Sequence, residues 1–362
     1  MSGRVSAAQW NRTLLARQYL LERADEDAIE VIDRLVGLHS QNPSNAFFAL
    51  WSRIEGFTPG ELDDLLIGRE VVRIELLRNT IFLIDGLDAR WIRPLAQATI
   101  DAEAQVWRRR LNNADPAAVI ADAAELLADG PLGDIELGGQ LLLRHPGENP
   151  TTLMMLARYG LALVQVPPHG LWAGSTTPTY RLLDDWIGAG EPELVGDAAR
   201  EELIRLYLRG YGPATLNAIE AWSGLSGLAP LVEKMERDWE LIRLDGPGGR
   251  ELFDLDGLGL AHPDTPAPVR LLAPDDHVIV AQGDGDRIAA ADFRRTATAN
   301  GRSPGFVLVD GRLAGRWRIM PSGAVDTELF ARLSGTHRDQ LDSELDRLAR
   351  FRCVGGALDS AG

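Results

Sequence analysis

The sequence predicts a mainly α-helical α+β fold, in which groups of helices are each closed by a β-hairpin and a β-rich domain follows. Apolar residues recur with helical spacing along most of the chain before His262. About three times along the chain, a group of predicted helices is followed by two short segments of alternating apolar and polar residues, joined by turn residues. Helices closed by a hairpin form a winged helix, so we expect tandem winged-helix repeats plus a C-terminal β-rich domain.

The first predicted winged-helix unit covers residues 1–115. Apolar spacing predicts two helices, and Gly37 ends the second of them. Ser44 is a suitable N-cap for a third helix, and the TPGE segment at Thr58 reads as a capping box for a fourth. The segments VVRIELL and TIFLI, separated by Arg78-Asn79, predict the hairpin.

The pattern recurs in residues 116–195 and again in residues 196–262. In the second unit, DPAAVIADAAELLADG, DIELGGQLLLRH and NPTTLMMLARYG predict helices, and LALVQVPP with TYRLL predicts a long hairpin. In the third, AREELIRLYLRGYG, ATLNAIEAWSG and LAPLVEKMERD precede the strands WELIRL and RELFDL. A linker, HPDTPAP, leads into residues 263–362, where GFVLVDGRLAGRWRI predicts a hairpin and Asp326 to Phe351 a helical tail.

Composition limits the classes of function. The chain has 362 residues and a net charge of −16, which argues against a protein that coats nucleic acid non-specifically but allows a local basic patch. The single cysteine, Cys353, excludes an intramolecular disulfide and a cysteine-based zinc site. No apolar run is long enough to span a bilayer, and the charged N-terminus is unlike a secretion signal. We therefore expect a cytoplasmic protein that does not bind membranes.

Sequence motifs for cofactors are missing. The chain has no GxGxxG, no P-loop motif and no HExxH, so we expect neither a nucleotide cofactor nor a metal. Asp275 and Asp276 precede His277, but adjacent residues in an extended segment point in opposite directions, which disfavours a shared metal ion.

The segment LHSQ, between two predicted helices, is the best candidate for chemistry. In an extended conformation His39 and Gln41 point to one side and Ser40 to the other, so the outer pair could hold one water. Histidine accepts a proton near neutral pH, and glutamine orients a water through its donor and acceptor atoms. The alternative is that these polar side chains are solvated or bind the backbone of the loop.

A resemblance to a known family supports the chemical interpretation. The segments RLVGLHSQNPSNAFFALWSRI, LLRNTIFLI, QVPPHGLW, GYGPATLNAIEAWSG, RLLAPDDHVIV and VLVDGRLAGRWRI resemble, in this order, the AlkZ/YcaQ-like family of winged-helix bacterial DNA glycosylases. His39 stands where that family usually has a first glutamine, Ser40 replaces a small apolar residue, and Asn79 and Phe82 replace a glycine and a histidine. The His-x-Gln variant resembles the subgroup associated with self-resistance to DNA-alkylating, intercalating antibiotics.

The resemblance implies a monofunctional DNA glycosylase that hydrolyses the N-glycosidic bond of N7-alkylguanine, without a cofactor. Gln41 would position a water at C1′ of the sugar, and His39 would orient it and accept its proton. No lysine lies beside His39 to form a Schiff base, so strand cleavage is not expected. The partner would be double-stranded DNA with an alkylated guanine, bound by a monomer. The arginines expected to contact DNA are Arg53, Arg73, Arg78, Arg108, Arg109 and Arg110.

Two other functions fit the sequence. One is a non-catalytic winged-helix protein that binds DNA, although LAPLVEKMERD is not rich in residues that read base edges. The other is a scaffold of tandem winged helices for protein contacts, which the acidic charge would suit.

Overall fold

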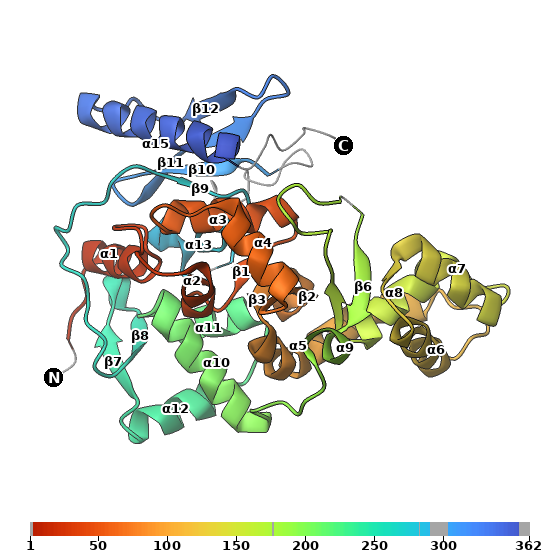
Figure 1. Ribbon diagram of the computed structural model, residues 1–362. Coiled ribbons are helices and arrows are strands. Elements are labelled where there is room, and N and C mark those ends of the chain that lie inside the picture. The colour runs from red at the N-terminus through yellow and green to blue at the C-terminus, as the bar shows by residue number, and fades with distance from the viewer. Residues whose placement is uncertain (1–2, 176, 282, 290–302, 355–362) are drawn as a thin grey trace.

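The computed structural model describes residues 3–175, 177–281, 283–289 and 303–354, and it confirms the α+β fold class (Figure 1). Helices surround small antiparallel sheets, and the sheet formed by the C-terminal strands lies as a separate layer over α3 (Figure 1). None of the described helices is both long enough and apolar enough to cross a bilayer.

The N-terminal elements follow the predicted order of helices and hairpin. They are α1 (Ala7–Arg17), α2 (Ala28–Arg34), β1 (Leu38–His39), α3 (Pro43–Arg53), α4 (Pro59–Gly68), β2 (Val71–Glu75), η1 (Leu77–Asn79) and β3 (Ile81–Asp85). The hairpin turns where predicted, because Arg78 and Asn79 both adopt positive φ, at 54° and 57°. A helix that the sequence analysis did not assign, α5 (Gly86–Arg108), follows directly. Asp85 caps it by accepting hydrogen bonds from the backbone of Leu87 and Asp88.

Two predicted helix caps are wrong in detail. Helix α3 is capped by Asn42, whose side chain accepts from the Ser44 backbone N–H at 3.1 Å, and Pro43 takes the first helical position. The capping box at Thr58 does not form, since Thr58 makes no side-chain cap bond. Glu61 instead accepts from the backbone N–H of Ala28 at 2.6 Å, so it caps the neighbouring helix α2.

The second and third groups also match their predicted elements. The second contains α6 (Pro116–Ala128), β4 (Leu132–Gly133), α7 (Asp134–Arg144), α8 (Pro150–Gly160), β5 (Leu163–Gln165), β6 (Thr179–Leu182) and α9 (Leu183–Ile187). The third contains α10 (Gly196–Tyr211), α11 (Leu216–Ser223), α12 (Ala229–Arg237), β7 (Leu241–Asp245), η2 (Pro247–Gly249) and β8 (Glu251–Leu255). Gly224, at φ 71°, provides the turn after α11.

The C-terminal part contains a strand that the sequence analysis took for helix. Its elements are β9 (Arg270–Leu272), α13 (His277–Val280), η3 (Gly285–Arg287), β10 (Gly305–Val309), β11 (Arg312–Ile319), β12 (Val325–Leu329) and α15 (Gly335–Val354). The predicted helical tail from Asp326 is wrong up to Ser334, because Val325 to Leu329 pair with β11 and leave Leu329 exposed. The helix begins only at Gly335, and it buries Leu341.

The first two hairpins form one continuous sheet. Its strand order is β1-β3-β2-β5-β6-β4, and the junction is the antiparallel pair of β2 with β5, in which Arg73 faces Gln165. The third hairpin, β7–β8, is a separate sheet, and β12-β11-β10-β9 form the C-terminal one. Strand β1 is therefore an edge strand of a six-stranded sheet shared by the two predicted N-terminal units.

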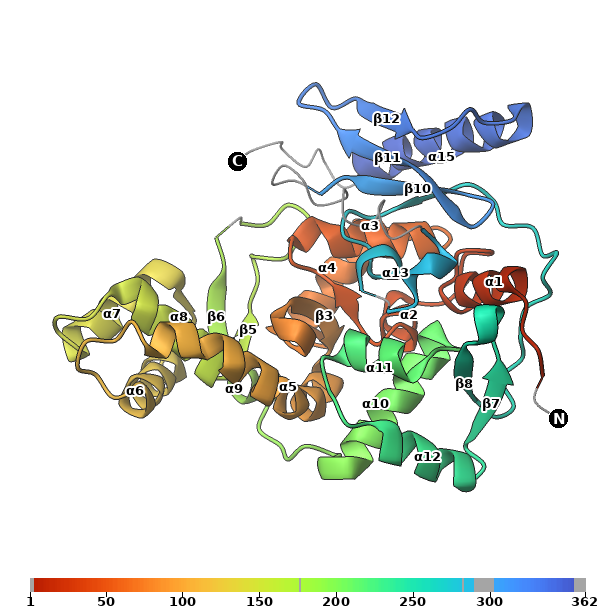
Figure 2. The same ribbon diagram turned by 180° about the vertical axis from the view of Figure 1, so that it is seen from behind.

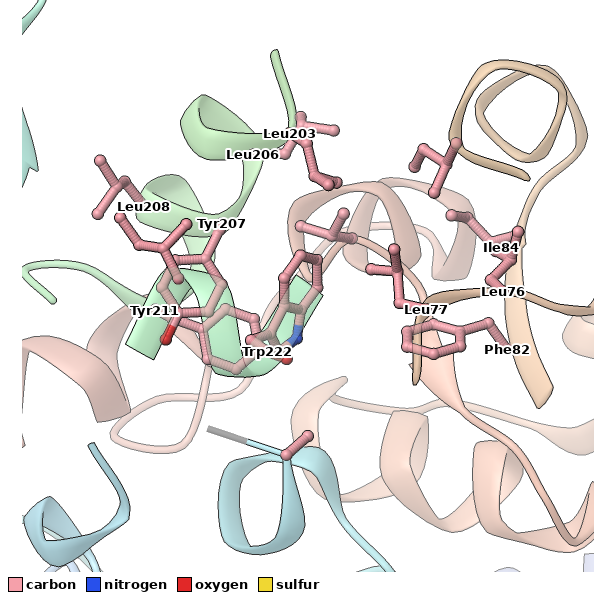
Figure 3. Packing of buried hydrophobic residues seen from close by; sticks show 14 of the residues in the cluster. Leu76, Leu77, Phe82, Ile84, Leu203, Leu206, Tyr207, Leu208, Tyr211 and Trp222 are labelled. Carbon is pink, nitrogen blue, oxygen red and sulfur yellow. The ribbon is translucent and has the colours of Figure 1, made fainter. Parts of the chain in front are cut away.

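The apolar core connects the first hairpin to the third group of helices. Leu77 and Phe82, from the hairpin, belong to the same buried cluster as Tyr207 and Tyr211 of α10 and Trp222 of α11 (Figure 3). The two tyrosine rings stack with centroids 4.8 Å apart. The later segment β9–α13 returns to the N-terminal part and lies beside α3 (Figure 2). Residues near positions 40 and 275 thereby become neighbours.

Candidate active site

The LHSQ segment is an ordered edge of the sheet. Strand β1 pairs His39 with Phe82, and the Ser40 backbone N–H donates to the carbonyl of Ile81 at 2.8 Å. Side chains alternate as the extended conformation predicts: Ser40 is fully buried, whereas Gln41 is exposed and His39 half-buried. The loop then runs through Asn42 into α3, whose N-terminus carries partial positive charge.

One bond fixes the orientation of the Gln41 side chain. Its Oε1 accepts from the backbone N–H of Ile81 at 3.2 Å, and because the donor is an N–H, the atom facing it must be the amide oxygen. The exposed Nε2 is then the part of Gln41 left to donate to a ligand or a water. Gln41 thus replaces one backbone bond of the β1–β3 ladder and still presents a polar group at the surface.

His39 is held neutral by its surroundings. Burial lowers the pKa of His39; Asp275 and Asp276 act in the opposite direction, and the cation of Arg78 lowers it further. Phe82 covers one side of the imidazole, with ring centroids 6.4 Å apart in an edge-on arrangement. Nδ1 is buried and has no hydrogen-bond partner among the described residues, whereas Nε2 is not buried in this way. A neutral imidazole with one accessible nitrogen can accept a proton at neutral pH.

Arg73 lies beneath the loop and does not face solvent. It is 1% exposed, donates through Nη1 to Ser40 Oγ, and donates through Nη2 to Gln165 Oε1 at 3.1 Å. Burial lowers the pKa of Arg73 to about 10, so the guanidinium remains charged at neutral pH, and within the described ranges it forms no ion pair. Gly170, at φ +97°, lets the backbone approach, since a Cβ there would come within 2.8 Å of Arg73 Cδ. In this structure the Arg73 guanidinium is therefore buried and faces protein groups, and its contact with DNA stays a prediction.

Arg53 is also a buried residue. It has no exposed surface and forms a two-pronged ion pair with Asp276, with Nη1–Oδ2 and Nη2–Oδ1 both at 2.8 Å. His277 Nε2 donates to Gln18 Oε1 at 2.8 Å beside this pair. Burial lowers the pKa of His277 to about 3, so it is neutral as well. The Arg53 guanidinium thus binds a carboxylate inside the protein in this structure, and its contact with DNA stays a prediction.

Arg78 anchors the tip of the first hairpin to the third group of helices. Its Nη1 donates to the backbone carbonyl of Trp222, and burial lowers the pKa of this half-buried guanidinium. Arg78 also lies close enough to His39 to influence its charge. This arginine therefore borders the loop, but its Nη1 is already bound to protein.

The basic run at the end of α5 is separated from the loop. Helix α5 extends from the edge of the hairpin to the lobe formed by α6, α7 and α8 (Figure 2). Arg108 pairs with Asp101 at 2.9 Å, and Arg110 lies 4.4 Å above the ring of Trp107. Arg109 and Arg110 are exposed. The structure thus places Arg73 and Arg78 beside the LHSQ loop and Arg53 on the Asp276 turn, whereas Arg109 and Arg110, the two exposed residues of the six, lie at the far end of α5.

Two further neighbours of the loop, Asp275 and Gln165, could not be predicted from the sequence. Asp275 is half-buried at φ 52°, and its Oδ2 accepts from Asn45 Nδ2 at 3.4 Å. The sequence disfavours a metal ion at the acidic pair before His277, and in the described ranges no three His, Cys, Asp or Glu side chains are grouped as metal ligands. The sequence held no signal for Gln165, because the pairing of β2 with β5 depends on contacts between distant segments.

Comparison with known proteins identifies relatives that cover most of the chain. The chain is 26% identical, over 356 residues, to an interstrand DNA cross-link repair glycosylase of Streptomyces sahachiroi, with 88% of this chain and 90% of that protein covered. The solved structure of Streptomyces sahachiroi DNA glycosylase AlkZ has the same fold, with a TM-score of 0.76, 21% identity and 98% of each chain covered. A family model for AlkZ-like DNA glycosylases matches residues 32–351. Since this match covers most of the sequence, the chain belongs to the AlkZ-like DNA glycosylase family.

Proposed function

We propose that this protein is a monofunctional DNA glycosylase that excises N7-alkylguanine, with bulky or intercalated natural-product adducts as its substrates. The observation that carries the proposal is the pair on one ordered loop: an exposed Gln41 whose oxygen is fixed, and a half-buried His39 whose pKa is lowered by burial. Base excision of such adducts would protect a cell that makes a DNA-alkylating antibiotic. The name of the Streptomyces relative, a cross-link repair glycosylase, supports large adducts.

The reaction needs little more than a positioned water and a proton acceptor. Alkylation at N7 gives guanine a positive charge, so the C1′–N9 bond breaks with its electron pair moving onto the base. The water oxygen then bonds to C1′, which has oxocarbenium character, while its proton passes to Nε2 of His39. Gln41 Nε2 donates to the water and holds it in place. The products are the free neutral base and an abasic site.

Two regions would contact DNA: the LHSQ loop, and the exposed arginines at the end of α5. Arg109 and Arg110 are exposed, and Arg110 lies over Trp107; among the described residues neither arginine forms an ion pair, so both can meet phosphates. We keep Arg108, which is paired with Asp101, as a secondary contact. On a protein of net charge −16, such a local basic patch supplies the salt-dependent part of the affinity.

The test is base release from defined duplexes. One duplex carries N7-methylguanine and another a bulky intercalating N7 adduct, and abasic sites are scored by alkaline cleavage. His39→Ala and Gln41→Ala should each lower release by about 10²-fold or more, the usual contribution of a positioned acid–base group. The matched controls are His262→Ala, in the exposed linker, and Gln105→Ala, on the exposed side of α5; both should leave release unchanged.

The opposite result would support a different function. Intact DNA binding without release from either duplex would overturn the glycosylase proposal and leave a winged-helix binding protein. The acidic net charge favours a scaffold for protein contacts as a second candidate. Salt dependence separates these two: a DNA binder loses affinity steeply as salt rises, whereas a protein scaffold binds no plain duplex at any salt concentration.

A further inference from the structure

An acidic side chain from the C-terminal half of the chain lies beside the His39 loop. Asp275 belongs to the turn between β9 and α13, and β9 contacts α3. Its Oδ2 accepts from Nδ2 of Asn45, a buried residue in the first turn of α3, at 3.4 Å. Since α3 starts at Pro43, immediately after the loop, this contact places Asp275 beside the end of the LHSQ loop, where its charge acts on His39.

The neighbouring ion pair fixes this turn against α3. Asp276 has no exposed side-chain surface, and both of its oxygens bind the Arg53 guanidinium at the end of α3. Helix α3 therefore contacts the turn through Asn45 and through Arg53. The positive φ of Asp275, 52°, costs conformational energy for a residue with a Cβ, and it persists because both neighbouring contacts hold the turn.

The charges that surround His39 are not equivalent. The groups that face it are Asp275 and Asp276 on the β9–α13 turn, Arg78 on η1 and His277 on α13. Asp276 is neutralised by Arg53, His277 is neutral, and Arg78 repels a proton on His39. Among the described residues Asp275 forms no ion pair, so its negative charge, unlike that of Asp276, is not offset by a bound arginine, and it is the larger of the two carboxylate influences on His39.

We propose that Asp275 is a positioning residue for His39: its carboxylate stabilises the imidazolium that forms when His39 accepts the proton of the attacking water. This inference rests on the proposed function. The Asp275 carboxylate would make His39 a stronger base for the proton of the water, because burial and the cation of Arg78 both lower the pKa of His39. Among the described residues no hydrogen bond joins Asp275 to the imidazole, so the carboxylate would act on His39 through its charge alone.

A purely structural role for Asp275 predicts different behaviour. If the carboxylate only accepted the bond from Asn45, its loss would loosen the turn and lower the rate equally at every pH. If it stabilises the imidazolium, its loss lowers the pKa of His39. The acid limb of the pH–rate profile then moves to lower pH, because His39 stays unprotonated in more acidic solution. The plateau rate also falls, since the base is weaker.

The experiment combines two readouts on the full-length protein. The pKa of His39 is followed by NMR of the imidazole, with the signal assigned through His39→Gln, and base release from the N7-methylguanine duplex is measured from acid to neutral pH. Asp275→Asn should lower the pKa of His39, shift the acid limb in the same direction, and reduce the plateau about three- to tenfold. Asp275→Glu should restore the limb towards its wild-type position. Asp264→Asn, an exposed acid in the linker, is the matched control and should change neither readout.

The outcomes are separable. An unchanged pKa of His39 in Asp275→Asn would overturn the role of Asp275, whether or not the wild-type protein releases base. A plateau loss without movement of the limb would overturn it as well and would favour the structural role. A wild-type protein that releases no base, while Asp275→Asn still lowers the pKa of His39, would overturn the proposed function and the catalytic role together. The electrostatic pair itself would then be supported.

Discussion

Replacing Asp276 with asparagine tests the buried ion pair between α3 and the β9–α13 turn. Neither Arg53 nor Asp276 has exposed side-chain surface, so water cannot take over the two 2.8 Å bonds when the negative charge is removed. Breaking a buried pair by changing one partner leaves an uncompensated charge in the interior and costs about 3–5 kcal/mol. Asp276→Asn keeps the shape and leaves the Arg53 guanidinium without its counter-charge, so we expect a loss in this range.

The assay is urea unfolding followed by far-UV circular dichroism, with calorimetry to test whether the transition is a single one. The exposed pair Arg318–Asp326, with a 3.2 Å contact, is the control, and Asp326→Asn should cost no more than about 1 kcal/mol. The double variant Arg53→Met with Asp276→Leu should lose less than the two single variants together, because no lone charge remains. An Asp276→Asn protein as stable as the Asp326→Asn control would refute the reasoning.

Three further predictions follow from contacts described above. Glu61→Ala should lower stability by about 1 kcal/mol, measured by thermal unfolding, because it removes the cap of α2, whereas Thr58→Ala, which loses no cap bond, should not. The pKa of His277 in the folded state, about 3, lies below the usual 6.5. The stability that neutral His277 contributes to the fold is therefore complete above pH 6.5 and declines as the pH falls towards 3. The wild-type thermal midpoint should fall across this pH window, and His277→Gln should make that fall smaller. Gly170→Ala should displace Arg73, because the new Cβ would lie 2.8 Å from Arg73 Cδ, and it should lower base release while DNA affinity stays the same. Base release equal to that of the wild type would count against a role for the close packing of Gly170 on Arg73.

Local signals account for most of the elements that the sequence predicted correctly. The hairpin at Arg78-Asn79 and the helix before Gly224 were predictable because turn chemistry and apolar spacing act over a few residues. The same local rules led to a wrong prediction of helix from Asp326, because leucines recur there with helical spacing. The residues from Val325 to Leu329 also alternate between apolar and polar, and they form strand β12. They also gave no prediction for α5, whose apolar spacing contains Pro94 in its third turn.

Contacts between distant segments explain the failures at the site. Arg73 stands among apolar residues on a strand, where an arginine is ordinarily taken to face solvent. Strand β5 then pairs with β2, and Gln165 and Gly170 cover the guanidinium. The burial of Arg53 could not be predicted either, because its partner Asp276 lies 223 positions later in the sequence. His39 and Gln41 could be singled out from their spacing, whereas Asp275 becomes their neighbour only in the folded chain.

The Arg53–Asp276 pair also has a consequence for synthesis on the ribosome. The two residues are 223 positions apart, and translation at about 5–20 residues per second separates their appearance by roughly 11–45 seconds. During that interval α3 carries an arginine whose buried counter-charge has not yet been made. The N-terminal helices can form before Asp276 is synthesised. Their final packing around the LHSQ loop needs the Arg53–Asp276 pair, so it follows only after the turn at Asp276 has left the ribosome. A nascent chain that ends before Asp276 would contain the LHSQ loop but not the turn that packs against α3.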